Sequence, residues 1–279
     1  MSSAQLLPAD LFRGRTVFIT GGAGDINLAI GEAFAAHDAN VGLCGRTGEK
    51  LDKARVRLES LGARVSTAVA DVRNYDDLEA GITRCGEECG PVSILVCAAA
   101  GNFLAPAEAL SPNGFKSVVD IDLLGSFNAC RAAFEQLRQT RGSIIFISAG
   151  QAFAPYFAQS HVGAAKAGVD NLMQNLALEW GRFGIRSNSI APGAVDETEG
   201  MRRIAPGQIR ERLASEIPLR RLGTVGDIAN AAIFLASPLA SYVTGTRLVV
   251  DGGMHLPGSG LYSKMIVNAL GGRAASDQD

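Results

Sequence analysis

A glycine-rich segment near the N-terminus has the residue types and spacing to bind a phosphate. It reads Thr20-Gly21-Gly22-Ala23-Gly24-Asp25-Ile26-Asn27 and stands between an apolar run, Thr16–Thr20, and a segment of helical periodicity, Leu28–His37. Glycines at such a strand-to-helix turn let the backbone approach a pyrophosphate, which the helix N-terminus then stabilises. The turn predicts a dinucleotide site with contacts from Gly21, Gly22, Asp25 and Ile26. A turn of purely structural purpose is the alternative.

The end of the second expected strand indicates which dinucleotide binds. In this kind of site an acidic residue there would hold the ribose 2′-hydroxyl. The sequence instead reads Leu43-Cys44-Gly45-Arg46-Thr47, with no carboxylate. A guanidinium forms charge-assisted hydrogen bonds with phosphate, so Arg46 favours a 2′-phosphate and predicts NADP(H) as the cofactor. An ordinary solvated arginine is the alternative.

Apolar strand segments and helical segments alternate along the chain and would position these residues. Strands are expected at Thr16–Thr20, Val41–Cys44, Val65–Ala70, Ile94–Ala98, Ser143–Ser148, Arg186–Ala191 and Arg247–Val250. Helices are expected at Leu28–His37, Glu49–Leu61, Tyr75–Cys89, Asn113–Gln139, His161–Trp180 and Asp227–Ala236. Strands buried on both faces read as continuous apolar runs, as these do. The pattern predicts one α/β domain over residues 1–279, doubly wound around a seven-stranded parallel sheet, with a substrate lid near 194–216.

Composition excludes several classes of function. The 279 residues are 47% hydrophobic and carry a formal net charge of -2, which disfavours nucleic acid or an anionic membrane as partner. We expect no membrane span and no signal peptide. The five cysteines lack metal-ligand spacing, although Cys85 and Cys89 one helical turn apart leave a two-ligand metal fragment as an alternative. We therefore expect reduced thiols in a cytoplasmic protein, and we expect no metal site.

Several motifs together resemble the short-chain dehydrogenase/reductase family over nearly the whole chain. They are Thr20-Gly21, Asp71-Val72, Ala99-Ala100-Gly101, Ser148, Lys166, Ala191-Pro192-Gly193 and Asp251-Gly252-Gly253. The resemblance implies a Rossmann fold and further cofactor contacts from Asp71, Val72, Ala99, Gly101, Lys166, Pro192, Gly193 and Thr198. Two glycine positions of the family's turn fall on Asp25 and Asn27. Asn tolerates a left-handed backbone, whereas Asp25 must turn outward, capping the helix, or it weakens cofactor binding.

Other stretches resemble one group of that family, the peroxisomal-type 2,4-dienoyl-CoA reductases. They are Ala99-Ala100-Gly101-Asn102-Phe103-Leu104, Asp120-Ile121-Asp122, His161-Val162-Gly163-Ala164-Ala165-Lys166, Thr198-Glu199-Gly200-Met201-Arg202-Arg203 and Ser237-Pro238-Leu239-Ala240-Ser241-Tyr242-Val243-Thr244-Gly245. The resemblance implies NADPH-dependent reduction of 2,4-dienoyl-CoA to 3-enoyl-CoA in the degradation of unsaturated fatty acids.

The catalytic residues implied by the resemblance depart from the usual family pattern. Lys166 is present, but the family's tyrosine four residues earlier is Val162, which cannot transfer a proton. The family's helix asparagine falls on Asp122, and the dienoyl-CoA reductase group pairs this carboxylate with the lysine around a water. The carboxylate keeps the ammonium charged, and together they polarise the water. Ser148 would donate to the thioester oxygen, and Tyr156 is an alternative acid.

The substrate side of the predicted site rests on the same resemblance. Arg73, Phe103, the Ser111–Asn113 turn with Ser111 and Asn113, and Arg203 are expected to contact an acyl-CoA, whose phosphates suit arginines. Each of them is equally consistent with an ordinary exposed residue. A reductase of another oxo or enoyl substrate and a nucleotide-binding protein without catalysis are the alternative functions. The resemblance further implies a homo-oligomer, either a homotetramer or a dimer.

Overall fold

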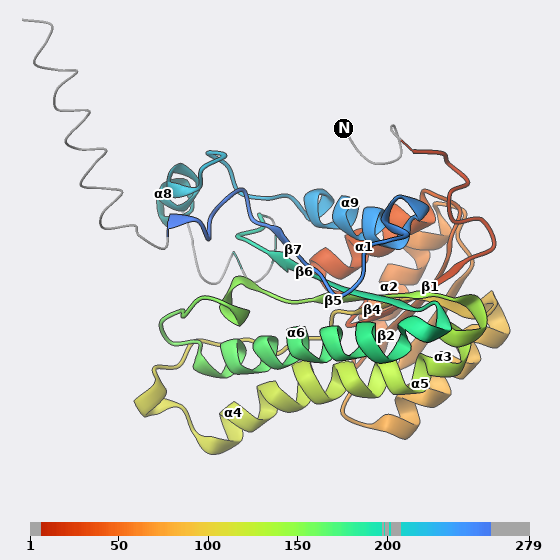
Figure 1. Ribbon diagram of the computed structural model, residues 1–279, viewed down its shortest axis with the longest axis horizontal. Helices are drawn as coiled ribbons and strands as arrows, with labels where there is room; N and C mark the ends of the chain where they lie inside the picture. The colour runs from red at the N-terminus through yellow and green to blue at the C-terminus, as the bar shows by residue number, and fades with distance from the viewer. Residues whose placement is uncertain (1–6, 197, 199–200, 202–207, 258–279) are drawn as a thin grey trace, which may run out of the picture.

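The computed structural model describes residues 7–196, 198, 201 and 208–257 of the chain (Figure 1). In this part of the chain, seven strands form one sheet in the order β3-β2-β1-β4-β5-β6-β7. The strands are β1 (Thr16–Thr20), β2 (Asn40–Gly45), β3 (Val65–Val69), β4 (Val92–Cys97), β5 (Ser143–Ile147), β6 (Arg186–Pro192) and β7 (Arg247–Val250). Every pairing between neighbours is parallel. The doubly wound Rossmann sheet predicted from the sequence is confirmed.

Helices cover both faces of the sheet (Figure 1). The described helices are α1 (Asp25–Ala35), α2 (Gly48–Glu59), α3 (Tyr75–Cys89), α4 (Pro112–Val119), α5 (Gly125–Thr140), α6 (Ser160–Trp180), α8 (Gln208–Glu216) and α9 (Val225–Ala236). Buried residues of α1, α2 and α9 form one apolar core with the sheet. Buried residues of α3, α5 and α6 form a second core on the other face. Continuous apolar strands are required because both faces are covered.

Strand β4 illustrates how the sequence supplies both cores. Its six residues are all buried. Ile94 and Val96 face the core of α1, α2 and α9, whereas Leu95 and Cys97 face the core of α3, α5 and α6. Successive side chains of a strand point to opposite faces, so a strand between two helical layers is apolar at nearly every position, and in β4 only Ser93 is polar. The strand therefore holds the following loop firmly at the edge of the sheet.

The long helix expected over Asn113–Gln139 contains an irregularity that periodicity does not show. Helix α4 is followed by a π-helical turn, Asp120–Leu124, and only then by α5. At the junction Gly125 lies against Val72, whose Cγ2 would be 2.5 Å from a Cβ at this position. Single π-helical turns inside α-helices occur frequently at functional sites. Here the turn contains Asp122.

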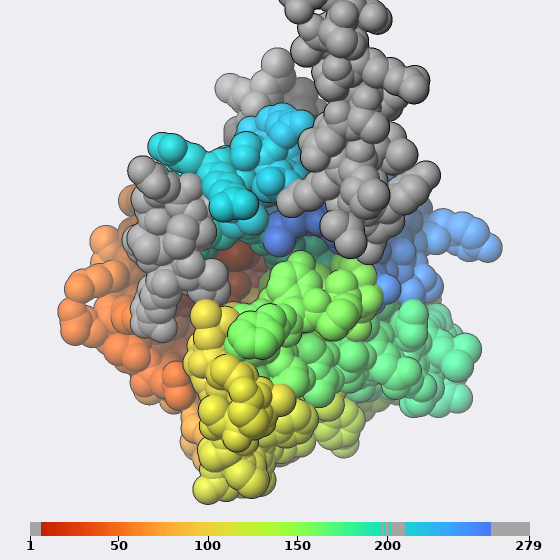
Figure 2. Space-filling model, turned by 90° about the vertical axis from the view of Figure 1, so that its left-hand side faces the viewer, coloured from red at the N-terminus to blue at the C-terminus, as the bar shows by residue number. Residues whose placement is uncertain are grey.

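The carboxyl ends of the strands meet at one edge of the sheet, which Figure 2 shows in space-filling form. In that view a hollow separates the chain near residues 150–160, in green, from α8, in cyan. The glycine-rich turn follows β1, the Ala99–Gly101 segment follows β4, and Ser148 follows β5. Open parallel sheets bind ligands at this edge, where the strand order reverses. The topology thus brings the predicted site residues to a single edge.

Candidate active site

The glycine-rich turn has no room for side chains where the sequence has Gly21 and Gly22. Gly21 has φ +66°, and a Cβ there would lie 2.9 Å from the Cα of Ala99. A Cβ on Gly22 would lie 2.7 Å from Leu43 Cδ2. The turn therefore packs directly against the ends of β2 and β4, and Gly22 N donates to Cys44 O at 3.0 Å. This cradle fits the pyrophosphate of a dinucleotide.

The two departures from the glycine pattern have different structural outcomes. Asn27 lies inside α1, and its Nδ2 donates to Gly21 O at 2.8 Å and Ala98 O at 3.1 Å. Asn27 is absent from the residues with positive φ, so its tolerance of a left-handed backbone is not the reason for its presence. Its amide instead ties the turn to the end of β4.

Asp25 is the first residue of α1 and its side chain is exposed. The N-cap is Gly24, so the expectation that Asp25 caps the helix is wrong. A carboxylate in the first helical turn interacts favourably with the helix dipole. It also places negative charge at the end where a pyrophosphate would bind. The predicted cofactor contacts of Asp25 and Ile26 stay predictions.

Arg46 is exposed just beyond the end of β2, near the carboxylate of Asp71. Asp71 is engaged mainly by Arg73, whose Nη2 lies 2.6 Å from Asp71 Oδ2 and whose Nε lies 3.0 Å from Oδ1. The hydrogen bond from the Arg73 side chain holds the pKa of Asp71 below its ordinary value. Arg73, expected to contact substrate, is thus paired with a residue expected to contact the adenine. Val72 between them is buried.

Lys166 and Asp122 are brought together in the interior. Lys166 Nζ lies 3.1 Å from Asp122 Oδ2, and both side chains are almost fully buried. The same Nζ donates to Ile147 O at 2.8 Å, while Asp122 Oδ1 accepts from the backbone N–H of Gly101 at 2.7 Å. Asp122 Oδ2 has no hydrogen bond among the described residues. One backbone group therefore holds each member of the pair, and Asp122 Oδ2 contacts Lys166 as an ion pair.

Val162 and Ser148 are two further positions at which the sequence predicts a role in the chemistry or the loss of one. Val162 is buried and packs with Val118 and Ala165, so its place is filled by an apolar cluster. Ser148 is also buried, and its Oγ has no hydrogen bond among the described residues. An unsatisfied buried hydroxyl costs stability unless a ligand uses it. The geometry is therefore compatible with the predicted role of Ser148, which stays a prediction.

A cavity of about 350 Å³ opens at the carboxyl edge of the sheet. It is lined by Ile26, Asn102, Leu104, Gln151, Tyr156, Phe157, Gln159, Pro192, Gly193, Ala194, Val195, Thr198, Met201, Leu213 and Met254. Cofactor-side residues expected from the sequence, namely Ile26, Pro192, Gly193 and Thr198, are among them. Asn102, Gln151 and Gln159 were not predicted as site residues. They lie in irregular segments, where no periodicity marks a side chain as facing a cavity.

Four of the predicted substrate residues, Arg73, Phe103, Ser111 and Asn113, are not among the described residues that line this cavity. The Phe103 ring packs on His161 with centroids 4.4 Å apart and is 40% exposed. Ser111 is the N-cap of α4 and accepts from Gly114 N at 3.1 Å. Asn113 is exposed in the first turn of that helix. Ser111 therefore has a structural role, and substrate contact by these residues stays a prediction.

Arg203 and part of the expected lid near 194–216 lie outside the described residues. The described part includes α8, where Arg210 forms an ion pair with Asp196. Thr198 Oγ1 donates to Val195 O at 3.0 Å and accepts from Met201 N at 3.1 Å. These contacts join Val195, Thr198 and Met201 to one another and join α8 to Asp196. The lid itself stays a prediction.

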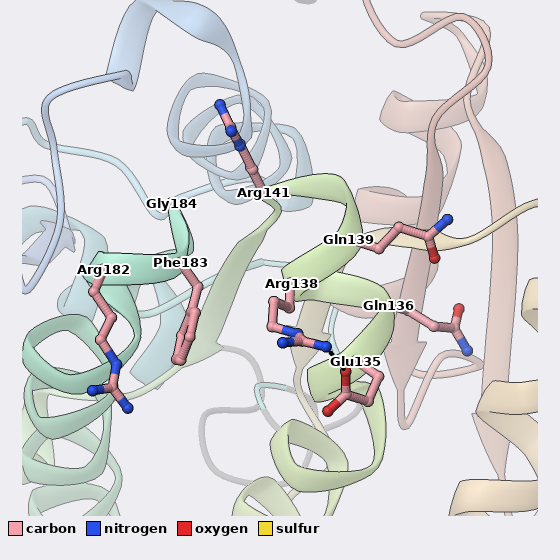
Figure 3. A pocket seen from close by; sticks show the side chains of 9 residues that line it. Glu135, Gln136, Arg138, Gln139, Arg141, Arg182, Phe183 and Gly184 are labelled. Atoms are coloured by element: carbon pink, nitrogen blue, oxygen red, sulfur yellow. Dashed lines mark ion pairs between the residues drawn. The ribbon is translucent and has the colours of Figure 1, made fainter.

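A second cavity of about 840 Å³ lies at the opposite edge, where α5 ends just before β5 begins (Figure 3). Its lining is polar, and Arg138 forms an ion pair at 2.8 Å with Glu135, which lies one turn earlier on α5. In the view of Figure 3, Arg141 and Arg182 point away from one another. The cavity is larger than the first but lies at the amino ends of the strands, away from every residue with predicted chemistry. The smaller cavity is therefore the candidate active site.

The sequence also predicts that the protein has no metal site and no membrane span. Within them no group of three His, Cys, Asp or Glu side chains could hold a metal ion. Cys85 and Cys89 are buried free cysteines on α3. Among the helices that the structure describes, none is long and apolar enough to cross a membrane.

Comparisons with known proteins agree with this geometry. Residues 21–255 match the family described as enoyl-(acyl carrier protein) reductase. The chain is 45% identical over 269 residues to a peroxisomal 2,4-dienoyl-CoA reductase of Saccharomyces cerevisiae, covering 94% of this chain and 92% of that one. It is 42% identical to the peroxisomal 2,4-dienoyl-CoA reductase of Arabidopsis thaliana, with 88% and 86% covered. A short chain dehydrogenase structure from Bacillus anthracis is 38% identical, with TM-score 0.78 and coverage of 87% and 97%.

The relatives correct one expectation and settle the family. The yeast and plant relatives are named as peroxisomal, which contradicts the cytoplasmic location expected from the sequence and points to the peroxisome. Reduced cysteines and a near-neutral charge do not distinguish these compartments, because targeting depends on short signals read by receptors. The matched residues include the glycine-rich turn, Asp122 and Lys166. The chain belongs to the short-chain dehydrogenase/reductase family.

Proposed function

We propose that the protein catalyses the NADPH-dependent reduction of 2,4-dienoyl-CoA esters to 3-enoyl-CoA in the degradation of unsaturated fatty acids. The observation that carries this function is the buried Lys166–Asp122 pair beside Val162. The pair supplies a proton without a phenol. The 45% identity to a yeast enzyme named as producing (3E)-enoyl-CoA supports the same reaction.

The residues present fit a nicotinamide dinucleotide. The glycine-rich turn would hold the pyrophosphate at the N-terminus of α1, and its close packing leaves no room for a Cβ at Gly21 or Gly22. Arg46 would bind the 2′-phosphate that distinguishes NADPH from NADH, and membership of this family supports the same cofactor. When bound, NADPH would supply a hydride to the distal end of the diene.

The chain's own residues would manage the remaining charge and proton. Lys166 Nζ is fixed by Ile147 O and lies 3.1 Å from Asp122 Oδ2. A water held beside this pair would protonate carbon 2 of the substrate, completing the addition of one hydride and one proton. Ser148 would donate its hydroxyl hydrogen bond to the thioester oxygen as negative charge develops there. The roles of Asp122 and Ser148 use buried oxygens, Asp122 Oδ2 and Ser148 Oγ, that have no hydrogen bond among the described residues.

The test is an NADPH-oxidation assay across conjugated dienoyl-CoA esters, with 3-oxoacyl-CoA as the control substrate. Loss of the conjugated dienoyl absorbance together with NADPH oxidation is expected, whereas 3-oxoacyl-CoA is left unreduced because Val162 cannot protonate an alkoxide. Turnover of the oxo ester in preference to the diene would overturn the proposal and favour the alternative reductase. Absence of NADPH binding by calorimetry would favour the non-catalytic alternative.

A homo-oligomer, either a dimer or a tetramer, is part of the same proposal. Large apolar side chains are exposed on the helical layer of α5 and α6 and on the adjoining π-helical turn, namely Leu124 at 44%, Phe127 at 46% and Leu178 at 82%. A second copy of the chain would bury them. Light scattering on the purified protein should give a multiple of the 29.1 kDa chain mass, and a monomer would contradict it.

A further inference from the structure

Three carboxamide side chains form a head-to-tail line along the wall of the active-site cavity. Gln151 Nε2 donates to Gln159 Oε1, and Gln159 Nε2 donates to Asn102 Oδ1 at 3.2 Å. The three residues come from the turn after β5, the residue before α6 and the loop after β4. All three line the cavity. The line therefore connects the two loops that face the substrate.

The direction of this line decides which atoms reach the cavity. A carboxamide has an acceptor oxygen and a two-donor nitrogen. Because Gln159 Oε1 is occupied by Gln151, Gln159 presents its nitrogen to Asn102. The Asn102 oxygen is thereby engaged, so its amino group is the end left for a ligand. Gln159 is only 6% exposed, which prevents it from turning into solvent.

The Asn102 loop is fixed to the same part of the molecule at other points. Gly101 N donates to Asp122 Oδ1 at 2.7 Å, which joins the start of the loop to the proton-delivering pair. Ala105 N donates to Ala158 O at 3.0 Å, and Phe103 O lies 3.1 Å from His161 Nε2. The backbone around Asn102 is thus held on both sides. Only the rotation of its carboxamide remains to be set, and Gln159 contacts that group directly.

We propose that Gln159 is a positioning residue that aims the amino group of Asn102 at the thioester oxygen of the acyl-CoA. The proposal rests on the proposed function, since the oxygen that gains charge belongs to a thioester. Two donors, Asn102 Nδ2 and Ser148 Oγ, would then stabilise the dienolate. Gln159 acts through Asn102 and touches no reacting atom.

Two substitutions separate orientation from packing. Gln159→Glu offers only acceptor oxygens, so Asn102 must turn its amino group toward residue 159 and its oxygen toward the developing negative charge. Gln159→Leu releases Asn102 without reversing it. We expect kcat to fall about 100-fold for Gln159→Glu and about 10-fold for Gln159→Leu, by analogy with the loss of one oxyanion donor. KM for NADPH should stay unchanged. Gln174→Glu, at an exposed position of α6, is the matched control for added charge and should retain full activity.

A double-mutant cycle with Asn102→Ala decides whether Gln159 acts through Asn102. In the Asn102→Ala background, Gln159→Leu should produce no further loss in kcat, because the group that it orients is gone. Independent losses that multiply, or full activity of Gln159→Glu, would overturn the proposal. Side-chain amide NMR provides a readout without turnover: Gln159→Leu should shift the Asn102 carboxamide signals. If the wild-type protein reduces no dienoyl-CoA, the proposed function fails. If Gln159→Leu leaves the Asn102 signals unshifted, the positioning role of Gln159 is overturned instead.

Discussion

The glycine-rich turn and the Lys166–Asp122 pair lie at the same edge of the sheet but work by opposite means. The turn offers backbone, and its central residues must lack side chains because Ala99 and Leu43 occupy the space. The pair offers side-chain charge, held inside the protein by Ile147 and Gly101. The difference teaches that the cofactor binding predicted for the turn depends on steric shape, whereas the proton delivery proposed for the pair depends on ionisable groups.

The comparison also explains which departures from the family pattern this chain tolerates. At the turn, Asn27 replaces a glycine because its amide finds two backbone oxygens beside β4. At the pair, the loss of tyrosine at Val162 is accompanied by a carboxylate at Asp122, 3.1 Å from the lysine. In the first region a hydrogen-bonding side chain stands at a glycine position, and in the second we propose that a carboxylate takes part in proton transfer in place of the tyrosine.

The largest effect is expected for Lys166→Met, which keeps most of the side-chain length but removes the charge. We expect kcat to fall about 100- to 10,000-fold, the usual contribution of general acid–base catalysis. Because Asp122 is left buried without its partner, a loss of stability of about 3–5 kcal/mol is also expected. Thermal melting shows over which temperatures the variant is folded, and kcat is measured within that range. A Lys166→Met variant that retains its activity would contradict the proposed role of the Lys166 charge.

Gly21→Ala should act on cofactor affinity through shape. The new Cβ meets the Ala99 backbone at 2.9 Å and must displace the cradle, so Kd for NADPH should rise about 100-fold if one or two phosphate hydrogen bonds are lost. Gly62→Ala is the matched control, because Gly62 also has positive φ, +90°, with nothing within 4 Å. Both variants carry the left-handed strain of about 1–2 kcal/mol. Equal NADPH affinities by calorimetry would contradict the steric account.

Arg46→Ala tests the one side-chain charge assigned to the cofactor region. Loss of a charge-assisted contact to the 2′-phosphate should weaken NADPH binding about 10-fold and leave NADH binding unchanged. Lys50→Ala, a charge removal in the first turn of α2, is the control. Equal weakening for both dinucleotides would show that Arg46 does not distinguish them.

The smallest effect is expected for Tyr156→Phe. Burial, with a further contribution from Asp251, raises the pKa of Tyr156 above its ordinary value, which makes it a poorer acid at neutral pH. If the buried pair delivers the proton, kcat should change by less than about threefold, a difference under 1 kcal/mol. A drop as large as that of Lys166→Met would transfer the proton-donating role to the tyrosine.

The seven-stranded parallel sheet could be predicted from the sequence, because strands such as Ile94–Val96 must be apolar on both faces. The family motif also predicted that Lys166 and Asp122 act together, and in the structure Lys166 Nζ lies 3.1 Å from Asp122 Oδ2. The π-helical turn at Asp120–Leu124 was not predictable, because apolar periodicity over two turns does not distinguish four-residue from five-residue hydrogen bonding. The Gln159–Asn102 contact joins residues 57 positions apart in irregular segments, where only the folded chain defines which side chains meet.

The most direct test of the central claim is kcat for Asp122→Asn with NADPH affinity measured on the same sample. Asparagine retains an oxygen for Gly101 N but loses the negative charge beside Lys166. Asp120→Asn, at a surface ion pair with Lys116 in the same turn, is the matched control. The account predicts a fall of at least about 100-fold in kcat for Asp122→Asn alone, with an unchanged Kd for NADPH. Full turnover by Asp122→Asn would contradict it.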